Sequence, residues 1–139
     1  MIMIWGAILL SQLMFLLMLF LVKPELFQFD FSGPLLGAKP PITLAMFAAA
    51  VTCFVGSFII RSTLVRKAIE AGKPLAVNAA VIVGVAMCEA VTLFGLVTAF
   101  VEDYPYFFVF FALGIIGILL HFPKRDDLMA AGFKSVAGK

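Results

Sequence analysis

The feature that most constrains this chain is a set of four long apolar stretches. They cover residues 1–22, 42–60, 75–101 and 106–122, and each ends at a charged residue or a proline. A helix needs about 20 apolar residues to cross a hydrocarbon core of about 30 Å, so the fourth stretch, at about 17, is at the lower limit. Only 13% of the 139 residues are charged, about half the share in an ordinary soluble domain. The pattern predicts an all-α, single-domain membrane protein with four transmembrane helices.

Composition excludes several other classes of protein. Two cysteines are too few for a disulfide scaffold, and a net charge of +2 is too small for the basic surface that binds nucleic acid. Unbroken apolar runs favour helices, because barrel strands alternate apolar and polar residues. The first stretch lacks a basic leader and a small-x-small cleavage site, so we expect a retained helix rather than a signal peptide.

The lysines and arginines predict the orientation of the helices. Eight of them lie in residues 61–74 and 123–139, whereas residues 23–41 contain two. The positive-inside rule therefore predicts a cytoplasmic loop at 61–74, a cytoplasmic tail at 123–139 and an external loop at 23–41. Both termini are then cytoplasmic, and the protein is a multi-pass protein of the inner (plasma) membrane. The alternating Phe27, Phe29 and Phe31 fit an interfacial loop better than a short strand.

Glu89 is the one acidic residue that we expect away from water, because it lies beside the midpoint of the third stretch. Insertion scales assign a charge at the bilayer centre a cost of about 2.5–3.5 kcal/mol, so this carboxyl group should be mostly protonated at neutral pH. A group that is neutral at rest but able to ionise can carry a proton, which makes Glu89 a candidate proton-binding residue. The alternative is a structural hydrogen bond between helices, to Thr52, Ser57 or a backbone carbonyl, contributing about 0.6 kcal/mol.

Asn78 and Thr92 are further candidate neighbours of Glu89. Asn78 precedes Glu89 by three helical turns, and Thr92 follows it by three residues, so all three share a helix face. Together they would form a polar route from Glu89 toward the cytoplasm.

Residues 84–100 read GVAMCEAVTLFGLVTAF and follow a polar segment that ends in Lys73-Pro74. This helix resembles the C-terminal helix of the c subunit (proteolipid) of F-type ATP synthases, and residues 43–101 resemble that subunit's helical hairpin, with one more transmembrane helix on each side. The resemblance implies that Glu89 matches the ion-carrying carboxylate of that family. Small residues fall in the family's small positions at Gly84, Ala86, Ala90 and Gly95. Because Ala90 offers no oxygen ligand, protons are favoured over sodium ions.

The remaining polar residues give no catalytic, metal or cofactor site. His121 is expected at the interface near the end of its helix, and Cys53 and Cys88 as buried free thiols. Gly114 and Gly117 indicate a helix-packing surface. We therefore expect no enzyme, but a small membrane subunit that handles protons through Glu89. Its expected partners are the lipid bilayer and other membrane subunits or further copies. The alternative function is a structural or accessory four-helix membrane protein.

Overall fold

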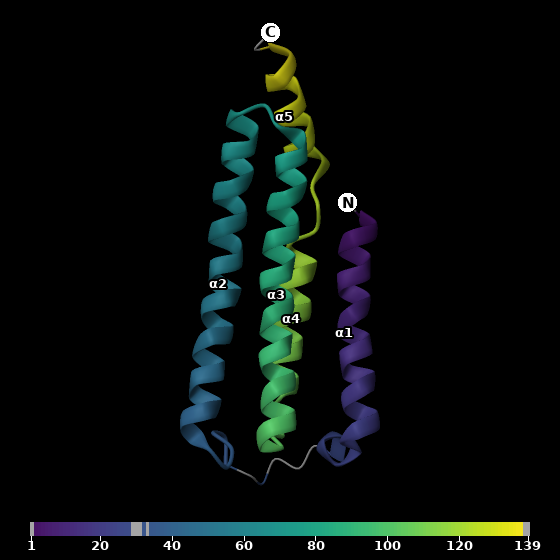
Figure 1. Cartoon of the computed structure of the whole chain (residues 1–139), viewed down its shortest axis with the longest axis vertical. Coiled ribbons are helices and arrows are strands. Elements are labelled where there is room, and N and C mark those ends of the chain that lie inside the picture. The colour runs from purple at the N-terminus through teal and green to yellow at the C-terminus, as the bar shows by residue number, and fades with distance from the viewer. Residues whose placement is uncertain (1, 29–31, 33, 138–139) are drawn as a thin grey trace.

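The computed structural model describes residues 2–28, 32 and 34–137, which form five α helices and one short 3-10 helix. In chain order these are α1 (Ile2–Val22), the 3-10 helix η1 (Pro24–Gln28), α2 (Pro40–Glu70), α3 (Pro74–Glu102), α4 (Phe108–Leu120) and α5 (Arg125–Ala137). Figure 1 shows α1 to α4 lying along one long axis, with α5 extending the bundle beyond α4. The prediction of an all-α fold is confirmed.

Three helices, α1, α2 and α3, are long and apolar enough to cross a membrane. α4 has 13 residues, and at 1.5 Å per residue it is about 20 Å long, shorter than a hydrocarbon core. The axes of α4 and α5 differ by 42° across a short break, and the two together would make a fourth candidate span. The chain is thus a membrane protein with three to four candidate spans. The fourth predicted helix, 106–122, is shortened to α4.

α2 continues through the segment that was predicted to be a loop at 61–74. The helix ends only at Glu70, so that a turn of three residues leads into α3. The cause is local, because the segment is rich in Arg, Lys, Ala and Glu, which are good helix formers. The turn forms at Gly72, whose φ of +59° suits a residue without a Cβ, and Pro74 then begins α3.

The segment predicted as a tail at 123–139 forms α5 within its described part, and α5 packs on the α2–α3 hairpin. Ala68, Val77 and Ala131 make a buried cluster that joins α2, α3 and α5. At the turn, a Cβ on Gly72 would lie 3.0 Å from the Ser135 backbone, so the two segments are in close contact. We call this the basic end of the bundle, because α2, the turn and α5 present their lysines and arginines here.

The opposite end of the bundle, the loop end, joins the end of α1 to the end of α3. Lys23 forms an ion pair with Asp103, and its ammonium group also donates to the carbonyl of Phe100 at 3.2 Å. A cation is favourable there because a helix C-terminus has a partial negative charge. In the predicted external loop, residues 24–28 form η1, whereas Phe29 and Phe31 lie outside the described residues.

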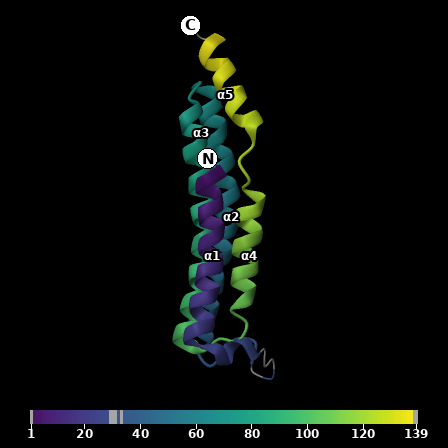
Figure 2. The ribbon, with the colours of Figure 1, turned by 90° about the vertical axis from the view of Figure 1, so that its right-hand side faces the viewer.

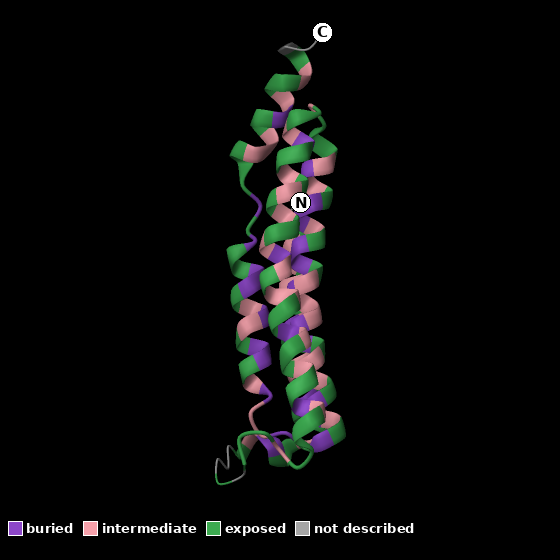
Figure 3. Ribbon diagram, turned by 90° about the vertical axis from the view of Figure 1, so that its left-hand side faces the viewer, coloured by how far each residue is buried: buried purple, intermediate pink, exposed green. Residues whose placement is uncertain are grey.

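α3 is the central helix, because it packs against α1, α2 and α4 (Figures 1 and 2). Its contact with α4 is close, since a Cβ on Gly95 would overlap Phe110, and one on Gly117 would lie 2.6 Å from the Cys88 sulfur. The predicted packing role of Gly117 is thus confirmed. Buried residues line the surfaces where helices meet, and exposed residues, many of them apolar, lie on the outward surfaces (Figure 3). Such an apolar exterior suits contact with lipid.

Candidate functional site

Glu89 lies in the middle of the bundle and contacts Ser11 of α1. The Ser11 Oγ atom is 2.6 Å from Glu89 Oε1 and 2.7 Å from the carbonyl oxygen of Ile8, one turn earlier in α1. Ser11 is close to the midpoint of α1 and Glu89 close to that of α3. At 1.5 Å per residue, Glu89 is about 20 Å from either end of α3. In a helix that spans a membrane, the middle is the depth where a charge is most costly.

The two contacts of Ser11 limit where its single hydroxyl proton can go. The Ile8 carbonyl can only accept a hydrogen bond, and an ionised carboxylate can also only accept. When Ser11 donates to Ile8, Glu89 must therefore be protonated and donate to Ser11 Oγ. When Glu89 is ionised, the Ser11 hydroxyl rotates so that it donates to the carboxylate and no longer to the Ile8 carbonyl. One hydroxyl thus satisfies both protonation states of Glu89 with no movement of heavier atoms.

The Glu89 side chain is half-buried, which leaves part of it open on the outer surface of α3. Among the described residues it has no ion pair, and Ser11 is its hydrogen-bond partner. Ala86, one turn earlier, is exposed, and Ala90 is half-buried. Small side chains beside the carboxyl group allow another helix to approach it closely.

The structure does not bring the predicted neighbours of Glu89 into contact with it. Thr52 is exposed and donates to the Ala48 carbonyl of its own helix, because it lies on the outward face of α2. Thr92 is fully buried against α4, where its hydroxyl has no partner among the described residues. Asn78 is half-buried and forms no side-chain hydrogen bond within that same part of the chain. The proposed polar route is thus not continuous within this chain.

A second polar cluster, which the sequence did not predict, surrounds His121. This residue is fully buried, and its ring lies against Phe58 at 4.5 Å between centroids. Its Nδ1 is 2.8 Å from the Gly117 carbonyl, so Nδ1 holds the proton and donates it. His121 lies at the end of α4, as expected, and its side chain is buried between helices.

Gly84 of α3 creates the space for His121. A Cβ at Gly84 would lie 2.5 Å from His121 Cδ2 and 2.9 Å from Nε2. The Cys88 sulfur is 3.9 Å from His121 Nδ1 and donates to the Ser57 hydroxyl at 3.4 Å. Because Nδ1 carries a proton that it donates to the Gly117 carbonyl, Nδ1 cannot also accept a hydrogen bond from the Cys88 thiol. The cluster joins α2, α3 and α4 through polar contacts. No local sequence signal indicates it, since it depends on a glycine 37 residues away from the histidine.

Glu89 is not the only acid removed from water, because Glu102 at the loop end is only 8% exposed. Thr43 of α2 donates to Glu102 Oε2, whereas Oε1 is buried and has no partner among the described residues. Gly37, with φ of +67°, approaches the same carboxyl group and the Tyr104 ring. The Tyr104 hydroxyl donates to the Leu35 carbonyl at 2.8 Å. These contacts attach the 34–37 turn to the end of α3, an arrangement that helix patterns alone do not predict.

The loop end should lose stability at strongly alkaline pH through Tyr104. Burial raises the pKa of its phenol above the ordinary value of about 10, and the neighbouring Tyr106 and Glu102 raise the pKa further. A raised folded-state pKa gives a contribution that is complete below pH about 10 and is lost as the pH rises through the folded-state pKa. We expect the alkaline fall of the melting temperature to be smaller in Tyr104→Phe than in the unmodified protein. Tyr106→Phe is the matched control, and an equal effect of both variants would contradict this assignment.

Comparison with protein family models, curated proteins and solved structures found no match to this chain. Among the described residues, no three His, Cys, Asp or Glu side chains are grouped so that they could hold a metal ion. Glu89 with its partner Ser11 therefore remains the candidate functional site.

Proposed function

We propose that this protein is a small, non-enzymatic membrane subunit that binds and releases a proton at Glu89. It acts within a larger complex or a homo-oligomer of the inner membrane. The basic end lies in the cytoplasm, as the eight lysines and arginines of residues 61–74 and 123–139 favour. Both termini are then cytoplasmic, and residues 106–122, which contain α4, make the fourth span.

The contact of Ser11 with both Glu89 and Ile8 is the observation that supports this proposal. A proton-binding carboxyl group must be tolerated in its charged and its neutral form, and a hydroxyl that can donate either way serves both. A purely structural hydrogen bond would be made at lower cost by an amide or a second hydroxyl. The resemblance of residues 43–101 to the proteolipid hairpin supports the same role, since α2 and α3 form a hairpin with Glu89 near the middle of its second helix.

The half-burial of Glu89 supports the oligomeric part of the proposal. A carboxyl group that faces lipid at mid-depth is costly, and ionisable side chains in membranes almost always face a protein interior or a water-filled cavity. Beside Glu89, the exposed Ala86 permits a second helix to cover the open side. A neighbouring subunit would thus both cover Glu89 and supply the proton path that this chain lacks.

Carbodiimide labelling of the purified protein tests the proposal, because the reagent modifies protonated carboxyl groups in apolar surroundings. We expect one principal labelled residue, Glu89, with labelling that declines as the pH is raised. Glu89→Gln should abolish it while changing stability by no more than about 0.6 kcal/mol, because an amide can still donate to Ser11. Glu102→Gln is the matched control and should leave labelling of Glu89 intact.

Ser11→Ala provides the second arm of this experiment. Removing the hydroxyl deprives the ionised carboxylate of its donor, so labelling should persist to higher pH than in the unmodified protein. The loss of the protonated-carboxyl signal in infrared difference spectra on raising the pH provides an independent measurement. If neither the labelling nor the infrared signal of Glu89 changes between acidic and alkaline pH, the proton-binding role is wrong.

The second candidate function is a structural or accessory membrane protein in which Glu89 fastens α1 to α3. The Ser11–Glu89 contact also favours this structural role, because it joins α1 to α3 through two residues that are 78 positions apart in sequence. In that case Glu89 would remain protonated throughout, its labelling would not change with pH, and Glu89→Gln would keep the function and assembly of the unmodified protein. Titration of Glu89 therefore separates the two functions.

A further inference from the structure

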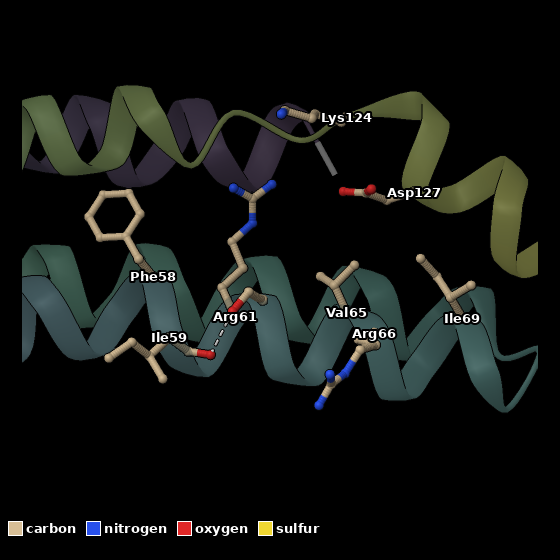
Figure 4. A pocket seen from close by; sticks show the side chains of 9 residues that line it. Phe58, Ile59, Arg61, Val65, Arg66, Ile69, Lys124 and Asp127 are labelled. Carbon is tan, nitrogen blue, oxygen red and sulfur yellow. Dashed lines mark hydrogen bonds between the residues drawn. The ribbon is translucent and has the colours of Figure 1, made fainter.

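A pocket of about 650 Å³ opens at the basic end, between α2 and the segment that connects α4 to α5. It is lined by Phe58, Ile59, Arg61, Ser62, Val65, Arg66, Ile69, Lys124 and Asp127. In Figure 4 the side chains of Phe58, Arg61 and Val65 extend from α2 toward the α4–α5 segment, where Lys124 and Asp127 form the opposite wall. The pocket thus has apolar walls with charged groups at its opening.

The lining carries more positive than negative charge. Arg61, Arg66 and Lys124 are basic and Asp127 is acidic. In Figure 4 Arg61 extends toward Lys124, whereas the Arg66 side chain points away from the opposite wall. None of the three cations forms an ion pair within the described part of the chain. The Arg61 guanidinium donates to the Phe122 carbonyl at the long distance of 3.4 Å, which leaves most of its donors unused. The pocket is therefore suited to a group with negative charge and several acceptor oxygens.

The depth of the pocket matches the boundary between the hydrocarbon core and the headgroups. Arg61 is the first charged residue after the apolar run of α2, and it reaches Phe122. The ring of Phe122 lies 5.1 Å from that of Trp5, the single tryptophan of the chain, whose indole donates to the Ile118 carbonyl. Tryptophan concentrates at the headgroup level of membranes. Lipid headgroups are accordingly the negatively charged groups nearest to this pocket.

We propose that this pocket binds the headgroup of an anionic phospholipid from the adjacent leaflet. The phosphate lies between Arg61 and Lys124, which extend into the same space in Figure 4. The acyl chains leave along Phe58, whose side chain faces that space one turn before Arg61. Basic pockets between helices at the membrane surface are suited to such headgroups, because the cations compensate the phosphate while the aliphatic walls contact the chains.

Lipid titration followed by native mass spectrometry tests this proposal on the purified protein in detergent. We expect phosphatidylglycerol to bind with one tight site and phosphatidylcholine with the same acyl chains to show none. Arg61→Gln with Lys124→Gln should weaken that site by about thirtyfold, since each basic side chain near anionic headgroups contributes a factor of about five. Lys124→Gln alone, at an exposed position, should weaken binding about fivefold without disturbing the fold.

Lys67→Gln with Lys73→Gln is the matched control, because it removes the same charge from exposed positions outside the pocket. This control should retain the tight site. Equal weakening in both double variants would show general attraction to a basic surface and overturn the proposal. Competition by inorganic phosphate at equal concentration would instead identify a soluble anion as the ligand, and equal binding of both phospholipids would also contradict the proposal. None of these outcomes depends on whether Glu89 titrates.

Discussion

Gly114→Ala should destabilise the protein by about 1–3 kcal/mol, although it adds a single methyl group and raises helix propensity. A Cβ at this position would overlap the Thr92 hydroxyl and lie 3.0 Å from the backbone oxygen of Cys88. The hydroxyl can move, but the Cys88 carbonyl belongs to α3 and moves only with the helix. The two helices would therefore have to separate along their contact. Unfolding by dodecyl sulfate titration, followed by circular dichroism, measures this change.

Gly6→Ala is the matched control for that substitution. Gly6 lies in α1, and a Cβ there would meet no atom within 4 Å, so the same change should be neutral or slightly stabilising. Combining Gly114→Ala with Thr92→Ala should recover part of the loss, because the overlapping hydroxyl is removed while the Cys88 carbonyl remains. If Gly114→Ala and Gly6→Ala behaved alike, the close α3–α4 contact would be wrong.

Gln12→Met should stabilise the protein by about 1–3 kcal/mol, which is the opposite of the usual effect of changing a buried residue. Gln12 is fully buried, and neither its amide nitrogen nor its amide oxygen has a partner among the described residues. It lies in α1 between an apolar cluster that includes Leu9 and another that includes Leu19. Methionine has a similar volume and shape and has no amide to leave unsatisfied. The same dodecyl sulfate titration measures the gain.

Gln28→Met is the control for Gln12, since Gln28 lies exposed on η1 and should show no gain. Destabilisation by Gln12→Met would show that the Gln12 amide is hydrogen-bonded in the assembled protein, and would contradict the expectation. Because Gln12 follows Ser11 directly, the labelling of Glu89 measured on the same variant would show whether the amide also affects the proton-binding residue.

The apolar stretches of the sequence were sufficient to predict the helix class and the positions of α1, α2 and α3. At residues 61–70 hydrophobicity falls, but the helix continues to Glu70, so the predicted end of the helix at residue 60 is wrong. Hydrophobicity indicates where a helix leaves lipid, whereas helix propensity and the turn at Gly72 decide where it ends. The length of α2 therefore depends on helix propensity, which the extent of an apolar stretch does not indicate.

The candidate site was predicted only in part, for a different reason. Glu89 can be identified from sequence alone, because an acidic residue within an apolar stretch is recognisable without knowledge of its neighbours in space. Its partner Ser11 cannot be identified in this way, because pairing depends on how α1 and α3 are aligned, and uniformly apolar helices give little periodic signal for that alignment. His121 and Glu102 show the same limit. Both are buried, and each is closely approached by a glycine that is distant in sequence. Gly84 lies against His121, and Gly37 lies against Glu102.

The partners of α1 also determine the order in which the protein can assemble during synthesis. α1 and Lys23 leave the ribosome before α2, α3 and α4. The polar contacts of Ser11, Lys23 and Trp5 are made with Glu89, Phe100 and Ile118, which are 78, 77 and 113 residues further along the chain. Until those segments enter the membrane, Ser11, Lys23 and Trp5 have none of these partners. The α2–α3 hairpin, joined by a turn of three residues, can close first. α1 can therefore complete its polar contacts only after α4, which carries Ile118, has been made.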